Sequence, residues 1–99
     1  PTFSYASSKA GVHHLTRSLA AHLAGRHINV NAIAPGIFWT PMVDGMPPHV
    51  QESLSASIPF PSRLGKAEEF AELAAHIMEN GYINGETIRL DGAVRLAPK

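Results

Sequence analysis

A chain of 99 residues forms at most one domain and can bury only a limited core. Eight basic and eight acidic residues give a net charge of zero without a basic stripe, which argues against nucleic acid as a partner. No apolar run reaches the roughly 18 residues of a membrane span, so no membrane contact is expected, and the lack of cysteine excludes disulfides and a thiolate nucleophile.

A long helix is predicted from Tyr5 to Ala24, with Ser4 as its N-cap and Gly25 as its stop. Its apolar residues recur at helical intervals (Val12, Leu15, Leu19, Leu23). Its many small residues would let another backbone approach closely, either within one subunit or between two subunits.

Tyr5 and Lys9 stand four residues apart, a spacing that places both on one face of this helix. A lysine ammonium beside a phenol favours the phenolate and lowers the tyrosine pKa from about 10, which makes the group usable as an acid or base. The competing interpretation is that the pair lies on an ordinary solvated face.

A strand is predicted over residues 28–34, where apolar residues alternate with Asn29 and Asn31, and Pro35-Gly36 ends it. Ligands in open parallel sheets bind beyond the carboxyl ends of strands, which is where residues 36–40 fall. Gly36 has no Cβ and would let the backbone come close to a ring. The alternative for these residues is a turn plus a helix cap.

Residues 37–65 carry five of the eight prolines, which argues against a regular core segment. Pro48 could begin a short helix in which Val50, Leu54 and Ile58 recur every four residues. The segment also holds several large apolar residues (Phe38, Trp39, Met42, Met46, Phe60). We interpret it as a mobile apolar flap over an acyl-like substrate; the alternative is that it covers the sheet edge.

A second amphipathic helix is predicted from Ala67 to Glu79, with acidic residues at its positive N-terminal end. Gly81 stops it, Asn84-Gly85 forms a turn, and a strand follows from Thr87 to Leu90. The strand, helix and second strand together predict an α/β fold with a parallel crossover.

Four motifs occur in an order that resembles the C-terminal part of a short-chain dehydrogenase/reductase (Tyr5–Gly11, Asn31–Gly36, Thr40–Met42, Asn84–Gly92). Within that family, Ile58–Gly65 and Arg89–Arg95 look most like the type 2 3-hydroxyacyl-CoA dehydrogenase branch. The resemblance implies that residues 1–99 are the C-terminal fragment of one Rossmann-like domain with a doubly wound parallel sheet. Their order would be helix, strand, lid with helix, and strand, and residues 37–65 would be the substrate lid.

The resemblance also implies a catalytic pair. Tyr5 would exchange a proton with the substrate oxygen, and Lys9 would favour the phenolate and bond the nicotinamide ribose. The cofactor, NAD or alternatively NADP, would contact Tyr5 and Lys9 and a group of residues after the strand (Pro35, Gly36, Ile37, Phe38, Thr40). The main chain at Ile37 or Phe38 would bond the carboxamide. The family's serine, asparagine and glycine-rich loop lie upstream of such a tyrosine.

The substrate implied is a 3-hydroxyacyl thioester or similar secondary alcohol, in a cytoplasmic homo-oligomer, dimer or tetramer, with the tail Ala93–Lys99 near a subunit interface. A 3-oxoacyl-acyl-carrier-protein reductase is the alternative within the enzyme class. Trp39 stands where many relatives have a smaller residue and would narrow the pocket for a long acyl chain. A different class is a non-catalytic remnant or assembly piece, and we expect the 99-residue chain alone to be inactive. The six histidines lack zinc-helix spacing, so no metal is expected.

Overall fold

The computed structural model describes the backbone of residues 2–95 and the side chains of residues 10–95. Pro1 and residues 96–99, the end of the predicted interface tail, lie outside this range. The elements follow in the order α1 (Thr2–Leu23), η1 (Ala24–Arg26), β1 (Ala32–Pro35), α2 (Pro41–Asp44), α3 (Pro48–Ala56), α4 (Ala67–Glu79) and β2 (Thr87–Leu90).

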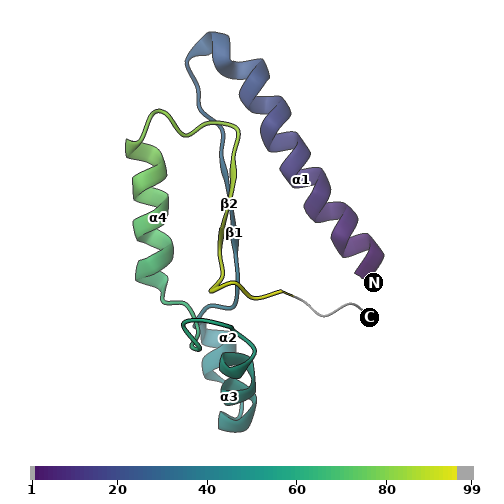
Figure 1. The fold of residues 1–99 in the computed structure, drawn as a ribbon, viewed down its shortest axis with the longest axis vertical. Helices are drawn as coiled ribbons and strands as arrows, with labels where there is room; N and C mark the ends of the chain where they lie inside the picture. The colour runs from purple at the N-terminus through teal and green to yellow at the C-terminus, as the bar shows by residue number, and fades with distance from the viewer. Residues whose placement is uncertain (1, 96–99) are drawn as a thin grey trace.

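The two strands form a parallel sheet in which Ala32 is opposite Thr87 and Pro35 is opposite Leu90. Helices α1 and α4 lie on opposite sides of this sheet, and α2 and α3 lie beyond the carboxyl ends of the strands (Figure 1). The predicted α/β architecture with a parallel pair of strands is therefore confirmed.

Helix α4 and strand β2 have the bounds that the sequence predicts. Glu68 and Glu69 lie in the first turn of α4, where acidic side chains interact favourably with the helix dipole. Gly85, in the bend before β2, has a φ of 74°, a conformation that residues with a Cβ rarely adopt. Local sequence signals decide the structure in this part of the chain.

Helix α1 differs from the prediction at both ends. It begins at Thr2, so Ser4 lies within the helix and is not its N-cap. It ends at Leu23 and tightens into the 3-10 turn of η1 before His27, which takes the left-handed conformation with a φ of 59°. No helix in the described part of the chain, α1 included, combines the length and apolar character needed to cross a membrane.

Strand β1 begins at Ala32, so the prediction of a strand over residues 28–34 is wrong for its first half. Asparagine side chains replace the ladder there: Asn29 Nδ2 donates to the Gly81 carbonyl at 2.9 Å and Asn31 Nδ2 donates to the Ile83 carbonyl at 3.0 Å. Because these side chains bond the loop before β2, the regular ladder starts only where β2 itself starts.

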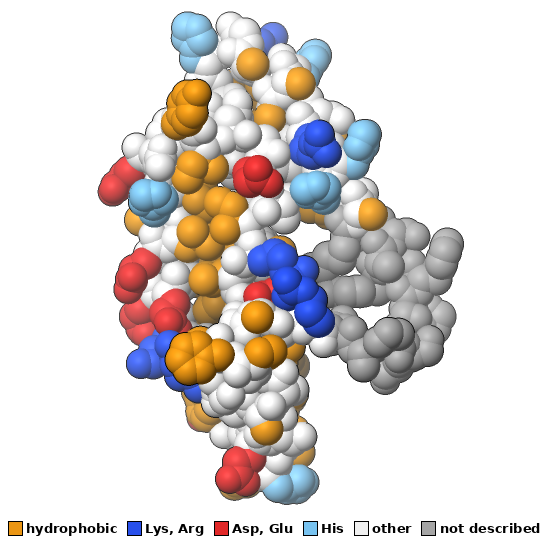
Figure 2. All heavy atoms as spheres, viewed as in Figure 1, with side chains coloured by type: hydrophobic (Ala, Val, Ile, Leu, Met, Phe, Trp, Pro, Cys, Tyr) orange, Lys and Arg blue, Asp and Glu red, His pale blue; other side chains and the backbone are white. Residues whose placement is uncertain are grey.

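Three buried apolar side chains of the segment 37–65, those of Val43, Ile58 and Leu64, pack together, and Ala20 of α1 is also buried. Elsewhere, large apolar side chains remain exposed, including Val12 and Leu15 of α1, and Figure 2 shows apolar side chains at the surface over α4 and the sheet. The radius of gyration is 15.8 Å, compared with the roughly 13 Å of a compact 100-residue domain. The described chain is therefore open, with one small core.

We expect Ile58→Ala to lower the free energy of unfolding by about 2–5 kcal/mol, because Ile58 is only 3% exposed and its removal leaves a cavity. Phe60→Ala is the matched control, since Phe60 is 82% exposed. Urea unfolding measures both variants; equal losses would contradict the assignment of the core to Ile58.

Candidate functional site

The candidate site is built around the turn of residues 35–40, where β1 ends. Gly36 N–H donates to the Leu90 carbonyl at 2.9 Å and continues the ladder one residue past the strand. Helix α1 runs antiparallel to the strands, so its first turns lie at the level of their carboxyl ends (Figure 1). The start of α1 thus lies level with the carboxyl end of β1, although α1 slants away from the sheet toward its N-terminus (Figure 1).

Tyr5 and Lys9 both lie in those first turns of α1, four residues apart on one helical face. Their side chains lie outside the described residues, so their catalytic role stays a prediction. One turn beyond Lys9, His13 Nδ1 is 2.7 Å from the Thr87 hydroxyl, a hydrogen bond that joins α1 to β2.

Gly36 is required by its contact with the end of β2. A Cβ at this position would lie 2.5 Å from the Asp91 Cβ and 2.7 Å from the Asp91 Cα. The sequence suggested that Gly36 leaves room for a ring, but the space beside its Cα is filled by Asp91. Its lack of a side chain therefore lets two chain segments touch.

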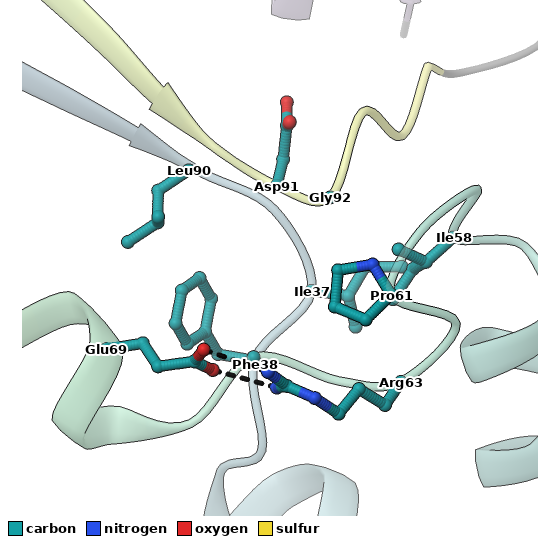
Figure 3. A pocket seen from close by; sticks show the side chains of 10 residues that line it. Ile37, Phe38, Ile58, Pro61, Arg63, Glu69, Leu90, Asp91 and Gly92 are labelled. Atoms are coloured by element: carbon teal, nitrogen blue, oxygen red, sulfur yellow. Dashed lines mark hydrogen bonds and ion pairs between the residues drawn. The ribbon is translucent and has the colours of Figure 1, made fainter.

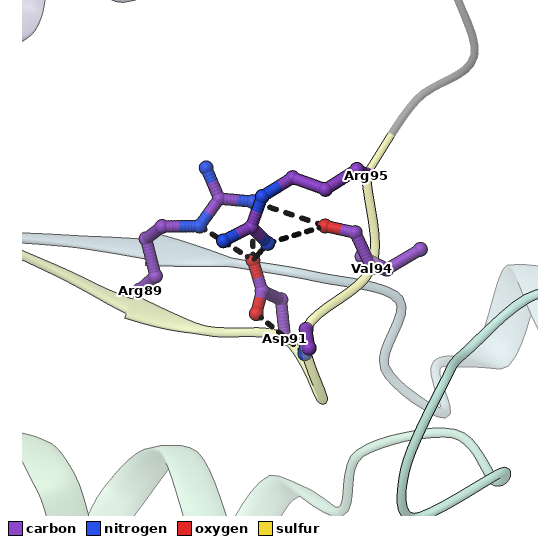
Figure 4. A network of polar contacts seen from close by, with 5 residues as sticks. Arg89, Asp91, Val94 and Arg95 are labelled. Carbon is purple, nitrogen blue, oxygen red and sulfur yellow. Dashed lines mark hydrogen bonds and ion pairs between the residues drawn. The ribbon is translucent and has the colours of Figure 1, made fainter.

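Asp91 is held in this contact by a network of arginines (Figure 4). Its Oδ2 accepts from Arg89 Nε at 2.9 Å and lies 2.6 Å from Arg89 Nη2 and 3.6 Å from Arg95 Nη1. Its Oδ1 accepts from Ala93 N–H at 3.0 Å. Both arginines also donate to the Val94 carbonyl. The Asp91 side chain is 10% exposed, so the end of β2 is firmly oriented against the turn.

Only some of the main-chain polar groups at Ile37 and Phe38 form hydrogen bonds with other backbone groups. The Ile37 carbonyl accepts from Gly65 N–H at 2.9 Å, and Trp39 N–H donates to the Gly65 carbonyl at 2.9 Å. Within the described part of the chain, the N–H groups of Ile37 and Phe38 have no backbone acceptor. Two adjacent donors therefore remain for a ligand.

Thr40 is the N-cap of α2, and its hydroxyl oxygen accepts from Val43 N–H at 3.3 Å. The alternative of a turn plus a helix cap thus describes these residues. A hydroxyl that accepts one bond still has its own O–H to donate, so the cap does not exclude a contact with a cofactor.

The segment 37–65 contains α2 and α3, and the predicted helix from Pro48 is confirmed although it ends at Ala56, before Ile58. Met42 and Phe60 are 74% and 82% exposed, and Trp39 is 47% exposed. A cavity of about 120 Å³ adjoins this segment, and Ile58, Pro61 and Leu90 help to line it (Figure 3). The segment therefore exposes apolar surface beside a small cavity.

A larger open cavity of about 670 Å³ lies between α1 and the sheet. Val12 and His13 line it from α1, the residues from Ala32 to Ile37 line it from β1 and the following turn, and Arg89 and Arg95 line it from the other strand and the tail. It includes Pro35 and Gly36, so it adjoins the turn in which the sequence predicts cofactor contacts.

An ion pair links the end of the segment 37–65 to α4 (Figure 3). Arg63 Nη1 and Nη2 bond the two Glu69 carboxylate oxygens at 2.8 Å and 2.9 Å. Glu69 also accepts from Lys66 N–H at 2.9 Å. The bonds from Arg63, and then that from Lys66, lower the pKa of the Glu69 carboxyl from 4.5 to about 2.

The sequence predictions missed Arg63 and Asp91 as organising residues and assigned Glu69 only to the helix dipole. Glu69 is the third residue of α4, the position from which a glutamate bonds the N-cap backbone, and this position was a usable signal. Among the described residues, no group of three histidine and acidic side chains is arranged to hold a metal ion.

The family described as enoyl-(acyl carrier protein) reductase matches residues 2–94. The bovine 3-hydroxyacyl-CoA dehydrogenase type-2 is 47% identical over 94 residues, which are 95% of this chain and 36% of the relative. The 3-oxoacyl-(acyl-carrier-protein) reductase of Thermotoga maritima is 42% identical over 92 residues, 91% of this chain and 37% of that protein.

A crystal structure of 3-hydroxyacyl-CoA dehydrogenase type-2 from Mycobacterium avium superposes with a TM-score of 0.90 at 48% identity, and covers 98% of this chain and 38% of that one. The fold is thus part of a Rossmann-like α/β domain. The chain belongs to the short-chain dehydrogenase/reductase family, as its motifs predict. It spans a little over a third of the length of these relatives.

We expect Gly36→Ala to destabilise the protein by roughly 2–3 kcal/mol, because the new Cβ would overlap the backbone of Asp91. Gly25→Ala is the control, since nothing lies within 4 Å of a Cβ built there. Chemical denaturation of both variants checks the prediction, and a Gly36→Ala protein as stable as Gly25→Ala would contradict it.

The ion pair also predicts a dependence of stability on pH. Since the folded pKa of Glu69 is about 2 and its ordinary value is 4.5, the folded state binds fewer protons between these values, and stability falls as the pH falls through this range. Because the pair is exposed, Arg63→Met should therefore lower the melting temperature at pH 6 by no more than about 2 °C, and this small effect should diminish toward pH 2.5. Thermal melts at several pH values measure this, with Arg17→Met as the control; a constant offset for Arg63→Met would contradict the assignment.

Proposed function

We propose that this chain is the C-terminal part of an NAD(P)-dependent dehydrogenase that interconverts a 3-hydroxyacyl thioester, or a similar secondary alcohol, and its ketone. In this proposal residues 1–99 belong to one domain and residues 37–65 are its substrate lid. The observation that carries it is that the first turns of α1, with Tyr5 and Lys9, lie level with the turn after β1, on the side of the sheet where the cavity of about 670 Å³ opens between α1 and the strands.

In the proposed reaction, Tyr5 gives its phenolic proton to the substrate carbonyl oxygen during reduction, and takes the hydroxyl proton during oxidation. Lys9 favours the phenolate of Tyr5 by its charge and donates to the ribose hydroxyls of the cofactor. The nicotinamide cofactor supplies or accepts the hydride when it is bound. The proton on Tyr5 is thus the part of the chemistry that this chain itself performs.

The residues after β1 suit a nicotinamide carboxamide, which has one acceptor oxygen and an amide donor. The N–H groups of Ile37 and Phe38 have no backbone acceptor among the described residues, and the Thr40 hydroxyl keeps its proton to donate. Pro35 and Gly36 line the adjoining cavity of about 670 Å³. We assign the cofactor as NAD, with NADP as the alternative.

Two observations favour a thioester substrate. The bovine relative at 47% identity is named as a 3-hydroxyacyl-CoA dehydrogenase, and the lid exposes the apolar side chains of Trp39, Met42 and Phe60. The Thermotoga maritima relative at 42% identity supports the second candidate, a reductase of 3-oxoacyl groups on acyl carrier protein. The width of Trp39 favours a short acyl chain in either case. A cytoplasmic homo-oligomer, dimer or tetramer, completes the proposal.

The test uses the full-length protein that contains this chain, with a short 3-oxoacyl-CoA and the matching acyl-carrier-protein thioester as substrates. We expect oxidation of the reduced nicotinamide, faster with the CoA thioester. Tyr5→Phe should lower kcat by about 10²- to 10⁴-fold because the proton donor is lost, while cofactor binding is retained. Absorbance at the nicotinamide band measures turnover.

Tyr82→Phe is the matched control, because Tyr82 is 99% exposed at the opposite end of α4 from the lid. The 99-residue chain alone should show no turnover, since the family's pyrophosphate-binding loop lies outside these residues. A full-length protein that binds no nicotinamide cofactor would support the non-catalytic alternative, and a fully active Tyr5→Phe variant would remove Tyr5 from the mechanism.

A further inference from the structure

The two ends of the lid, residues 37–39 and Gly65, are hydrogen-bonded to each other, and we call this junction the neck. Gly65 N–H donates to the Ile37 carbonyl and Trp39 N–H donates to the Gly65 carbonyl, both at 2.9 Å. A Cβ on Gly65 would lie 2.6–2.8 Å from three carbons of the Phe38 ring, so this glycine lets the two arms of the lid touch. Whatever fixes Gly65 therefore also fixes the main chain of residues 37–39.

Arg63 and Glu69 form the ion pair that we call the clasp (Figure 3). The clasp holds the residue that precedes Gly65. Arg63 Nη1 and Nη2 bond the Glu69 carboxylate, and Nη1 also donates to the Leu64 carbonyl at 3.1 Å, directly before Gly65. Glu69 is anchored in turn to the first turn of α4 through Lys66 N–H. The clasp thus connects α4 to the neck of the lid.

The exposure of the clasp shows that folding stability is not its main effect. The Arg63 and Glu69 side chains are 43% and 38% exposed, and exposed ion pairs contribute little to the free energy of unfolding. Leu64 supplies the buried contact in this segment, at 6% exposure. The two parallel bonds of a guanidinium and a carboxylate instead fix the orientation of one side chain relative to the other, because they define a common plane.

We propose that Arg63 is a positioning residue for the turn of residues 35–40. We call it the cofactor turn because the proposed function assigns contacts with the nicotinamide to it. The clasp holds the Leu64 carbonyl and Gly65, Gly65 holds the Ile37 carbonyl, and the peptide groups of Ile37 and Phe38 then present their N–H groups at a fixed angle. This inference rests on the proposed function, since it assigns those N–H groups to the nicotinamide carboxamide.

A second contact supports a separate role for each arm of the neck. The Phe38 ring meets the Phe70 ring of α4 edge-to-face, with centroids 6.2 Å apart and an interplanar angle of 87°. Phe38 and Arg63 therefore attach the outgoing and returning arms to the same helix. Loss of Arg63 frees only the returning arm, which contains Gly65. The cofactor turn then loses the orientation that Gly65 gives to the Ile37 carbonyl, while the contact between Phe38 and Phe70 keeps the lid on α4.

The experiment compares Arg63→Met, Arg63→Lys and Glu69→Gln in the full-length protein with the control Glu68→Gln. Glu68 is exposed in the same turn of α4 and is not part of the clasp. We expect Arg63→Met to raise the KM for the nicotinamide cofactor by about 5- to 30-fold, because a displacement of about 1 Å can cost 100-fold. Its melting temperature at pH 7 should stay within about 2 °C of wild type.

Arg63→Lys keeps the charge but not the paired bonds, so it should lie between Arg63→Met and wild type. The double variant Arg63→Met/Glu69→Gln should resemble Arg63→Met, since the two residues act as a unit. In the cofactor-free protein, hydrogen exchange of the Gly65 and Trp39 amides should speed up by about 10-fold in Arg63→Met and not in Glu68→Gln.

The outcomes separate the two proposals. If wild type turns over but Arg63→Met keeps the wild-type KM, the positioning role is overturned and the proposed function stands. If the amide exchange of Gly65 is unchanged, the path from the clasp to the turn is overturned. If wild type neither binds nor oxidises the reduced cofactor, the proposed function is overturned, and the positioning role with it.

Discussion

The rest of the structure depends on the contact between Gly36 and Asp91 at the carboxyl ends of the two strands. The parallel ladder brings the two segments together, and only a residue without a side chain can stand opposite the Asp91 backbone at this distance. Gly92, the next residue, has a φ of 60° and would carry a Cβ 2.6 Å from Ile58, so the same corner also receives the lid core. One corner therefore fixes the turn of residues 35–40 on one side and the segment around Ile58 on the other.

Charged side chains hold this corner from two directions, and their burial gives them different roles. The Asp91 carboxylate is 10% exposed and is shared by two arginines, so removal of its partners would leave a charge with little solvent around it. The clasp of Arg63 and Glu69 is much more exposed, and its value lies in orientation more than in stability. The inner network keeps β2 against the turn, whereas the clasp orients the segment that enters α4.

The sequence predicted the elements whose signals are local. Helix α4 was found with its bounds because its apolar periodicity coincides with acidic residues at its start, and β2 because alternation follows a glycine turn. The start of β1 was missed because Asn29 and Asn31 have the alternation of a strand but bond a loop about 50 residues away. The clasp was missed for a similar reason: Arg63 and Glu69 are six residues apart across a bend, and no helical or strand periodicity links them.

The candidate site was also predicted only in part from the sequence. Tyr5 with Lys9 and the turn after β1 could be singled out because each is a short motif, but only the antiparallel course of α1 places its first turns level with the carboxyl ends of the strands. The role of Gly36 could not be inferred, since a glycine at a strand end suits a ligand and a neighbouring backbone equally well. Because Asp91 fills the space beside Gly36, the donors that can face a ring are the next N–H groups, those of Ile37 and Phe38. In our proposal, the direction of these N–H groups depends on the bond between Gly65 N–H and the Ile37 carbonyl. The geometry of the turn therefore depends on the residues before α4 as much as on β1.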